Sequence, residues 1–229
     1  MNKPPCRLFL VFAADAPIAV ILRRGPTRHW KVIKWNTDTD SFQDGQWFFG
    51  NFYPERCGLS PDGSLFVYFA AKYRRQHPDG YANAFTAVSR PPYLTALAMW
   101  PSCSTWGGGG VFEDNLTLRL AYGRYHTCHP GNTDTELYMG SLPPVHPNHP
   151  SGPLQIETEL HHYSPDIEFV GPPGDYPEAD WTGVDHRGRK IFIRQGLLYS
   201  FVDRVEVLLR DFNPDVFEEV VSPEWARVW

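Results

Sequence analysis

A short phrase that recurs along the chain constrains the fold more than any other feature of the sequence. In each copy a glycine, a tight turn and an apolar run follow one another. The turns are Ser60-Pro61-Asp62-Gly63, Phe112-Glu113-Asp114-Asn115 and Asp185-His186-Arg187-Gly188. Gly, Asn and Asp at such positions are typical of the turn between two antiparallel strands. Three diverged copies therefore predict an all-β repeat architecture.

Extending each copy forward gives about four strands per unit. The N-terminal segment lacks one strand, and we predict that the tail, residues 217–229, supplies it. This pairing of the two ends would close a ring and leave no exposed sheet edge at either end. We therefore predict one domain, residues 1–229, folded as a small, about four-bladed β-propeller; an open β-sandwich is the alternative. The predicted strands are 8–13, 18–23 and 30–35, then 65–71, 84–90 and 93–100, then 116–122, 136–140 and 154–160, then 190–194, 197–202 and 205–211.

Six residues have equivalent places in the copies. A glycine precedes each turn, where neighbouring blades converge and a side chain would be crowded. A Gly or Asn also ends each turn, where a positive φ is commonly required. The first set is Gly58, Gly110 and Gly183, and the second is Gly63, Asn115 and Gly188.

The turn Ser60-Pro61-Asp62-Gly63 and the apolar strand after it resemble the WD40-like repeats of TolB-type β-propellers. This resemblance implies four-stranded blades and a binding role. More loosely, the chain is similar to uncharacterised bacterial proteins in which such a turn is followed by a Trp-Gly-Gly-Gly-Gly run, here Trp106–Gly110. That second resemblance implies no activity.

Composition restricts the partners and the compartment. A net charge of −5 argues against general nucleic-acid binding, although two basic clusters allow a local contact. The four cysteines are too widely spaced for a disulfide framework. No apolar stretch approaches the ~20 residues of a membrane span, so we predict a soluble cytoplasmic protein with reduced thiols. The basic clusters are Arg23, Arg24, Arg28, Lys31 and Lys34, and Lys72, Arg74 and Arg75.

Several patterns suggest chemistry, each with a structural alternative. The glycine run lacks the Lys and Ser/Thr of a phosphate loop, which favours close packing. Histidines and a cysteine in a Pro-rich region offer ligands for zinc, or are simply solvated. Acidic residues in another Pro-rich segment could act as paired carboxylates, and Cys57 or Cys103 could pair with a histidine. The candidate metal ligands are His126, Cys128, His129 and His146, and the acidic residues are Asp166, Glu168, Asp175, Glu178 and Asp180.

Aromatic and arginine residues in two loops favour protein binding, because these types are enriched at interface hot spots. We predict a non-catalytic protein-binding or scaffold module without a cofactor, which presents loops from a rigid frame. A metal-dependent or carboxylate-based hydrolase that uses the histidine and acidic loops is the alternative. The predicted binding residues are Tyr73, Arg74, Arg75, Tyr81, Arg90, Tyr93 and Trp106.

Overall fold

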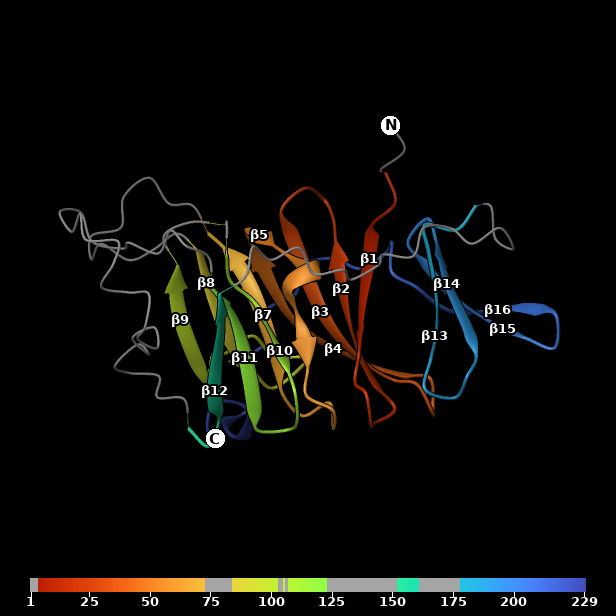
Figure 1. The fold of residues 1–229 in the computed structure, drawn as a ribbon. Helices are drawn as coiled ribbons and strands as arrows, with labels where there is room; N and C mark the ends of the chain where they lie inside the picture. Colours follow the sequence, from red (N-terminus) through yellow and green to blue (C-terminus); the bar gives the residue numbers. More distant parts are fainter. Residues whose placement is uncertain (1–3, 73–83, 103–104, 106, 123–151, 161–177) are drawn as a thin grey trace.

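The computed structural model describes residues 4–72, 84–102, 105, 107–122, 152–160 and 178–229 (Figure 1). This part of the chain is all-β, as predicted, and its strands form four sheets of three to five strands. Within the same part of the chain, no helix is long and apolar enough to cross a membrane.

The first sheet is an antiparallel meander in the order β1-β2-β3-β4. Its strands are β1 (Arg7–Phe12), β2 (Ile18–Arg24), β3 (His29–Asn36) and β4 (Ser41–Phe49). The first three confirm the predicted strands to within one residue at each end, whereas β4 was not predicted. Its centre carries Asp44-Gly45, a pair that is typical of turns. Here glycine is needed because a Cβ atom at Gly45 would lie 2.1 Å from the carbonyl oxygen of Pro92.

The second sheet is built around β7, whose residues are all buried. β7 pairs with β8 along its length and with the short strands β5 and β6. Strand β9 begins only at Ala98, so residues 93–97 of the predicted strand 93–100 are not part of the sheet. The strands are β5 (Asn51–Phe52), β6 (Gly58–Leu59), β7 (Phe66–Ala71), β8 (Ala84–Ser89) and β9 (Ala98–Ser102), with the 3₁₀ turn η1 (Pro54–Arg56) before β6.

The third and fourth sheets differ in how their strands run. The third contains β10 (Gly110–Phe112), β11 (Thr117–Tyr122) and β12 (Gln155–Leu160), and β12 is parallel to β11. An up-and-down blade would need an antiparallel pair there. The predicted strand 136–140 lies outside the described residues. The fourth sheet is an antiparallel meander of β13 (Trp181–Val184), β14 (Lys190–Arg194), β15 (Leu197–Val202) and β16 (Val205–Asp211), and its last three strands have the predicted bounds.

Three hydrophobic clusters join the sheets in the order fourth, first, second, third. The apolar run of strand β2 is continuous because the strand packs against a sheet on each of its two faces. Ala19 and Ile21 face the fourth sheet, while Val20 and Leu22 face the second. Alternate side chains of a strand point to opposite faces, so a strand between two sheets must be apolar at every position. Within the described part of the chain, no hydrophobic cluster joins the third and fourth sheets. In Figure 1 the fourth sheet lies at one side of the molecule, the first in the middle, and the second and third overlap at the other side.

The turns next to these clusters are hydrogen-bonded from sheet to sheet in the same order. The repeated turns of the sequence take part in each link, so they hold neighbouring sheets together as well as reversing the chain. The bonds are Arg189 Nη2 to Thr37 O (2.7 Å), Asp15 N to Pro61 O (2.9 Å) and Asp62 N to Asn115 Oδ1 (2.9 Å).

The predicted roles are confirmed for four of the six positions, and Asn115 and Gly183 depart from them. Gly63 and Gly188 have positive φ values of 70° and 75°. Asn115 is not among the positive-φ residues, so that prediction is wrong; its side chain instead accepts the hydrogen bond from Asp62 N. A Cβ atom at Gly58 would lie 3.2 Å from Gly110 O, so two of the preceding glycines do lie where strands converge. At Gly183 the close neighbour would be the Trp181 ring.

The predicted pairing of residues 217–229 with the first sheet is wrong. This segment contains no strand, and its regular structure is the 3₁₀ turn η2 (Glu224–Ala226). β4 already provides the fourth strand of the first sheet. Gln46 N in β4 donates to Pro92 O (3.1 Å), so part of the free edge is covered by the 90–97 segment rather than by the tail.

Candidate functional site

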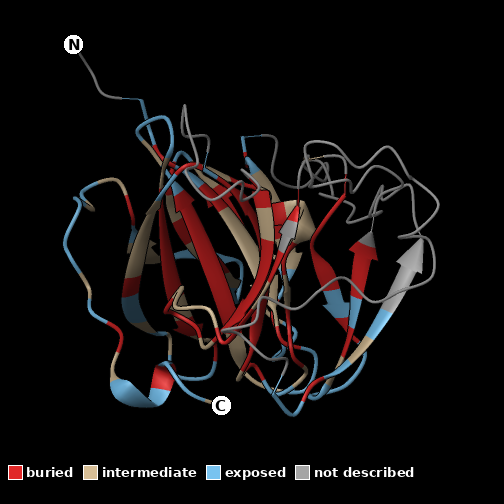
Figure 2. Ribbon diagram, turned by 90° about the vertical axis from the view of Figure 1, so that its left-hand side faces the viewer, coloured by how far each residue is buried: buried red, intermediate tan, exposed pale blue. Residues whose placement is uncertain are grey.

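The C-terminal tail, residues 212–229, passes from the fourth sheet across the first and second sheets to the third. It starts at Phe212, which is fully buried between the fourth and first sheets. Beyond Phe212 the chain is extended and mostly exposed, with the short η2 turn near the C-terminus (Figure 2). The tail therefore lies on the sheets as a surface segment.

An ion-pair network fixes the beginning of the tail. The Asp215 carboxylate accepts a hydrogen bond from Lys31 Nζ (2.9 Å) and lies 3.2 Å from Arg210 Nη2. The Lys31 side chain is only 7% exposed and also contacts Asp44 at 3.0 Å. A buried lysine requires such partners, so Asp215 is a firm anchor point.

Gln46 of β4 binds the middle of the tail. Its Nε2 donates to Val220 O (2.9 Å), and its Oε1 accepts from Leu94 N (2.7 Å). One side chain thus connects β4, the 90–97 segment and the tail.

Two contacts follow next along the tail. The hydroxyl groups of Thr95 and Ser222 are hydrogen-bonded. The Tyr93 and Trp225 rings meet edge to face, with centroids 5.6 Å apart, and Gln43 Nε2 donates to the Tyr93 hydroxyl at 3.3 Å. An edge-to-face pair of this kind contributes about 0.5–1.5 kcal/mol beyond the burial of area.

The end of the tail lies against the second and third sheets. Arg90 Nε donates to Val228 O at 3.3 Å, and Trp229 packs against the cluster that contains Leu154. We call Gln46, Arg90, Tyr93 and Thr95 the tail cradle. These side chains contact two main-chain carbonyls, one small hydroxyl side chain and one aromatic ring, as a peptide-binding surface does.

Little of the tail beyond Phe212 is buried. Ser222 and Ala226 are 3% and 0% exposed, whereas the large apolar side chains stay in contact with solvent. Segments with few buried contacts open at low free energy, well below that of global unfolding. The exposed side chains are Val216, Phe217, Val221, Trp225 and Val228.

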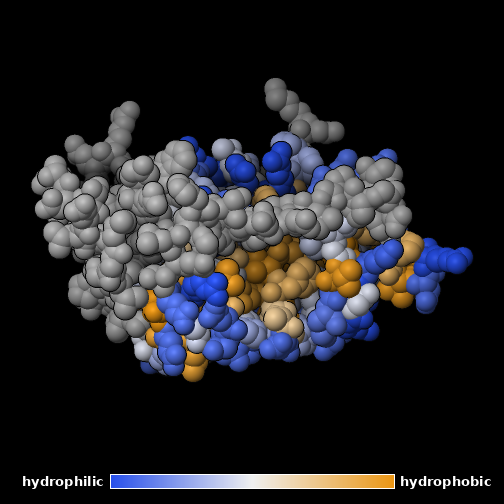
Figure 3. All heavy atoms as spheres, in the orientation of Figure 1, coloured by the Kyte–Doolittle hydropathy of each residue, from blue (hydrophilic) through white to orange (hydrophobic). Residues whose placement is uncertain are grey.

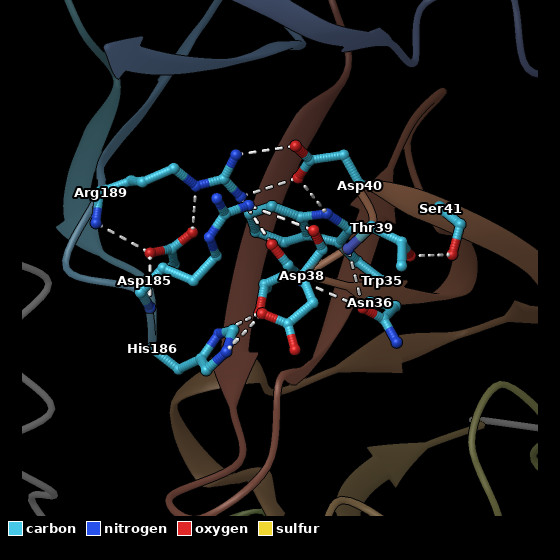
Figure 4. A network of polar contacts seen from close by, with 11 residues as sticks. Trp35, Asn36, Asp38, Thr39, Asp40, Ser41, Asp185, His186 and Arg189 are labelled. Atoms are coloured by element: carbon cyan, nitrogen blue, oxygen red, sulfur yellow. Dashed lines mark hydrogen bonds and ion pairs between the residues drawn. The ribbon is translucent and has the colours of Figure 1, made fainter. Parts of the chain in front are cut away.

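A second polar cluster joins the β3–β4 turn to the β13–β14 turn (Figure 4). Arg189 donates to both oxygens of Asp40 (2.7 and 2.8 Å) and to Asp185 Oδ2 (2.7 Å). The hydrogen bonds that Arg189 donates lower the pKa of Asp40, and donation to Asp40 and Asp185 raises the pKa of Arg189. The Asp185 side chain is completely buried. This cluster is an ionic junction between the fourth and first sheets.

The same junction contains three residues in the order of a catalytic triad. Thr37 Oγ1 lies 2.5 Å from His186 Nδ1, and His186 Nε2 lies 2.9 Å from Asp38 Oδ1. A triad needs a nucleophile that substrate can reach. Thr37 is 1% exposed, so its hydroxyl serves the junction rather than a reaction.

Three other predicted sites, the glycine run, Cys57 and Asp180, fall on described residues and can be compared with the structure. The prediction that the glycine run is closely packed is confirmed, since Cβ atoms at Gly108 and Gly109 would lie 2.2 Å from the Phe69 ring and 2.4 Å from Arg56 O. Cys57 is a buried free thiol whose pKa is raised by burial, which makes it a poor nucleophile. Asp180 accepts a hydrogen bond from Gln195 N (2.7 Å).

Of the predicted binding residues, the structure describes two, Arg90 and Tyr93, and brings both to the tail cradle. Gln46 and Thr95 were missed, because isolated polar residues carry no periodic signal. Within the described part of the chain, no group of three potential metal ligands occurs. The remaining candidates lie outside the described residues: Tyr73, Arg74, Arg75, Tyr81, Trp106, His126, Cys128, His129, His146, Cys103, Asp166, Glu168 and Asp175.

The chain matches no protein-family model, no curated protein and no solved structure. The resemblance to WD40-like and TolB-type repeats therefore stays a prediction from the turn sequence.

Proposed function

We propose that this protein is a non-catalytic binding module that takes an extended segment of a partner protein on its tail cradle. The observation that carries the proposal is that the cradle already holds a peptide, the protein's own residues 220–228. Arg90 and Tyr93, two of the residues predicted to bind a partner, make part of these contacts. The tail is then an internal ligand that a partner segment replaces.

The cradle defines the kind of segment that fits. Gln46 and Arg90 donate to main-chain carbonyls, which any extended peptide offers. Thr95 and Tyr93 contact side chains and select for a small hydroxyl residue followed by an aromatic residue. Ser222 and Trp225 show this spacing of three residues. We therefore infer a preference for Ser or Thr at one position and Trp, Tyr or Phe three residues later.

We further propose that the four sheets serve as the blades of a propeller-like frame. Supporting this are the contacts of β6 with β1 and β10, and the lack of room at Gly58, where a Cβ atom would lie 3.2 Å from Gly110 O. Figure 3 shows apolar side chains in a hollow in the region where β1 and β6 lie in Figure 1. Residues Phe9 to Phe12 of β1 are partly buried, in keeping with a position near such an axis. Cytoplasmic location stays a prediction from composition.

Controlled cleavage of the tail tests the binding function. A protease site inserted after Val216, whose side chain is 63% exposed, would release residues 217–229 without removing Asp215. After cleavage, a fluorescent peptide of residues 217–229 should exchange with the bound segment. Tyr93→Ala should weaken the binding about three- to tenfold, the equivalent of an aromatic pair.

Phe49→Ala is the matched control, because Phe49 is 56% exposed and contacts His29 instead of the tail (centroids 4.9 Å apart). It should leave peptide affinity unchanged. A segment that never exchanges in the folded, cleaved protein would refute the proposal, as would equal effects of Tyr93→Ala and Phe49→Ala.

A further inference from the structure

A pocket of about 690 Å³ lies at the end of the first sheet where β1 begins and β2 ends. Its polar lining includes Cys6, Arg7, Arg23, Arg24, Gln195 and Asn213, and prolines and Leu197 add apolar wall. The pocket is formed by the first and fourth sheets and is separate from the tail cradle. Its lining contains three arginines and no carboxylate.

Two of these arginines lie directly opposite each other. Arg7 of β1 and Arg24 of β2 are cross-strand partners in the ladder. Like charges in this arrangement destabilise a sheet unless another group neutralises them. Within the described residues, neither side chain makes an ion pair; the Arg24 guanidinium donates to Thr27 O (3.2 Å) and lies 5.3 Å from the Trp30 ring centroid.

Arg23 is a buried cation without a carboxylate partner in the described part of the chain. The residue is 1% exposed, and its guanidinium donates to three carbonyl oxygens, those of Gly25, Phe212 (3.1 Å) and Asp215 (3.2 Å). It also lies 5.5 Å from the Trp47 ring centroid. Carbonyl groups satisfy donors but do not neutralise the charge, and a buried unneutralised charge is costly.

The two carboxylates that act electrostatically on Cys6 in the pocket wall have other partners. Lys31 and Arg210 hold the Asp215 carboxylate, and the Asn213 amide groups hold Asp211. Arg7 and Arg24 lie on the same face of the β1–β2 pair, and their charges are therefore left for a ligand. Arg23 lies on the opposite face of β2 with its donors used by carbonyls, so it adds only a fixed positive charge.

We propose that this pocket binds the phosphate group of a small organic phosphate. The guanidinium group is planar and pairs with phosphate oxygens through two parallel hydrogen bonds, and several arginines suit a dianion better than a single carboxylate. The volume exceeds that of the anion alone, and the proline and Leu197 walls accept the apolar part of the molecule. Figure 3 shows hydrophilic residues at the corresponding edge of the molecule, where the β2–β3 turn lies in Figure 1.

Calorimetric titration of the full chain with phenyl phosphate, inorganic phosphate and acetate tests the proposal. Phenyl phosphate should bind most tightly and acetate most weakly. Arg7→Ala and Arg24→Ala should each reduce phenyl phosphate affinity about tenfold or more, as expected for loss of a charge-assisted hydrogen bond.

Arg28→Ala is the matched control, since Arg28 is exposed on the adjacent turn but does not line the pocket. It should leave the affinity unchanged. Absent phosphate binding, equal binding of acetate, or an equal loss in Arg28→Ala would overturn the proposal. Tyr93→Ala, which disrupts the tail cradle, should not alter phosphate binding, so this site and the peptide surface succeed or fail separately.

Discussion

Removal of Arg189 should strongly destabilise the protein, because this side chain links the fourth and first sheets. Its side chain is 14% exposed and neutralises Asp185, which is completely buried, and Asp40, which is 29% exposed. In Arg189→Ala the Asp185 carboxylate would keep two backbone N–H donors but lose its cation. Breaking a buried ion pair in this way costs about 3–5 kcal/mol, although partial exposure of Asp40 favours the lower end.

Equilibrium unfolding in urea at neutral pH, followed by circular dichroism, would measure this loss of unfolding free energy. For a chain of this size, the melting temperature should fall by about 6–20 °C. Arg187→Ala is the matched control, because Arg187 is exposed and its side chain donates to Asp38 O at 3.2 Å, while its main-chain bond to Asp185 would remain in the variant. It should change stability by less than about 0.5 kcal/mol. If Arg189→Ala cost less than about 1 kcal/mol, as an exposed ion pair does, the ionic junction would not be a structural requirement.

Three further predictions concern the same frame. The pKa of Asp40 is lower in the folded protein than its ordinary value of about 4, so ionised Asp40 stabilises the fold above that value, and this stabilisation is lost as pH falls through the folded pKa. The difference in unfolding free energy between wild type and Asp40→Asn should therefore become smaller in acid, as measured by urea unfolding at several pH values. Gly108→Ala should cost about 1–3 kcal/mol more than Gly188→Ala in urea unfolding, because a Cβ atom at Gly108 would meet the Phe69 ring whereas one at Gly188 would meet nothing within 4 Å. Gln46→Ala should speed proteolysis within residues 217–229 with a smaller effect on global unfolding; equal effects on both would show that the tail does not open separately.

Much of the sheet structure could be predicted because buried strands have distinctive sequences. β2 and β7 lie between two sheets and are apolar on both faces, and the Asp and Gly residues of their turns reverse the chain. β4 was missed because it contains Asp44-Gly45 and polar residues whose roles depend on distant partners, Lys31 and Pro92. The parallel direction of β12 relative to β11 is not specified by local patterns, because a strand's own residues do not show from which end it joins a sheet.

For the tail, the sequence predicted a strand that the structure does not contain. Its apolar residues favoured a strand, but the structure leaves Phe217, Val221 and Trp225 exposed and binds the main chain through side chains of the cradle. Arg90 and Tyr93 could be proposed as contact residues from their type alone. That they contact the protein's own tail depends on the packing of sheets distant in sequence, and no local signal indicates it.

Native-state hydrogen exchange is the most direct test of the central proposal, that the tail is a displaceable peptide on a rigid frame. The amides of Ala226 and Arg227, which donate to Pro223 O and Glu224 O, should exchange through local opening, with little dependence on denaturant. The amides of β2 and β3, whose central residues are buried between sheets, should exchange only on global unfolding. Exchange of the tail amides at the same free energy as those of β2 and β3 would contradict the account, because the tail would then be an integral part of the fold.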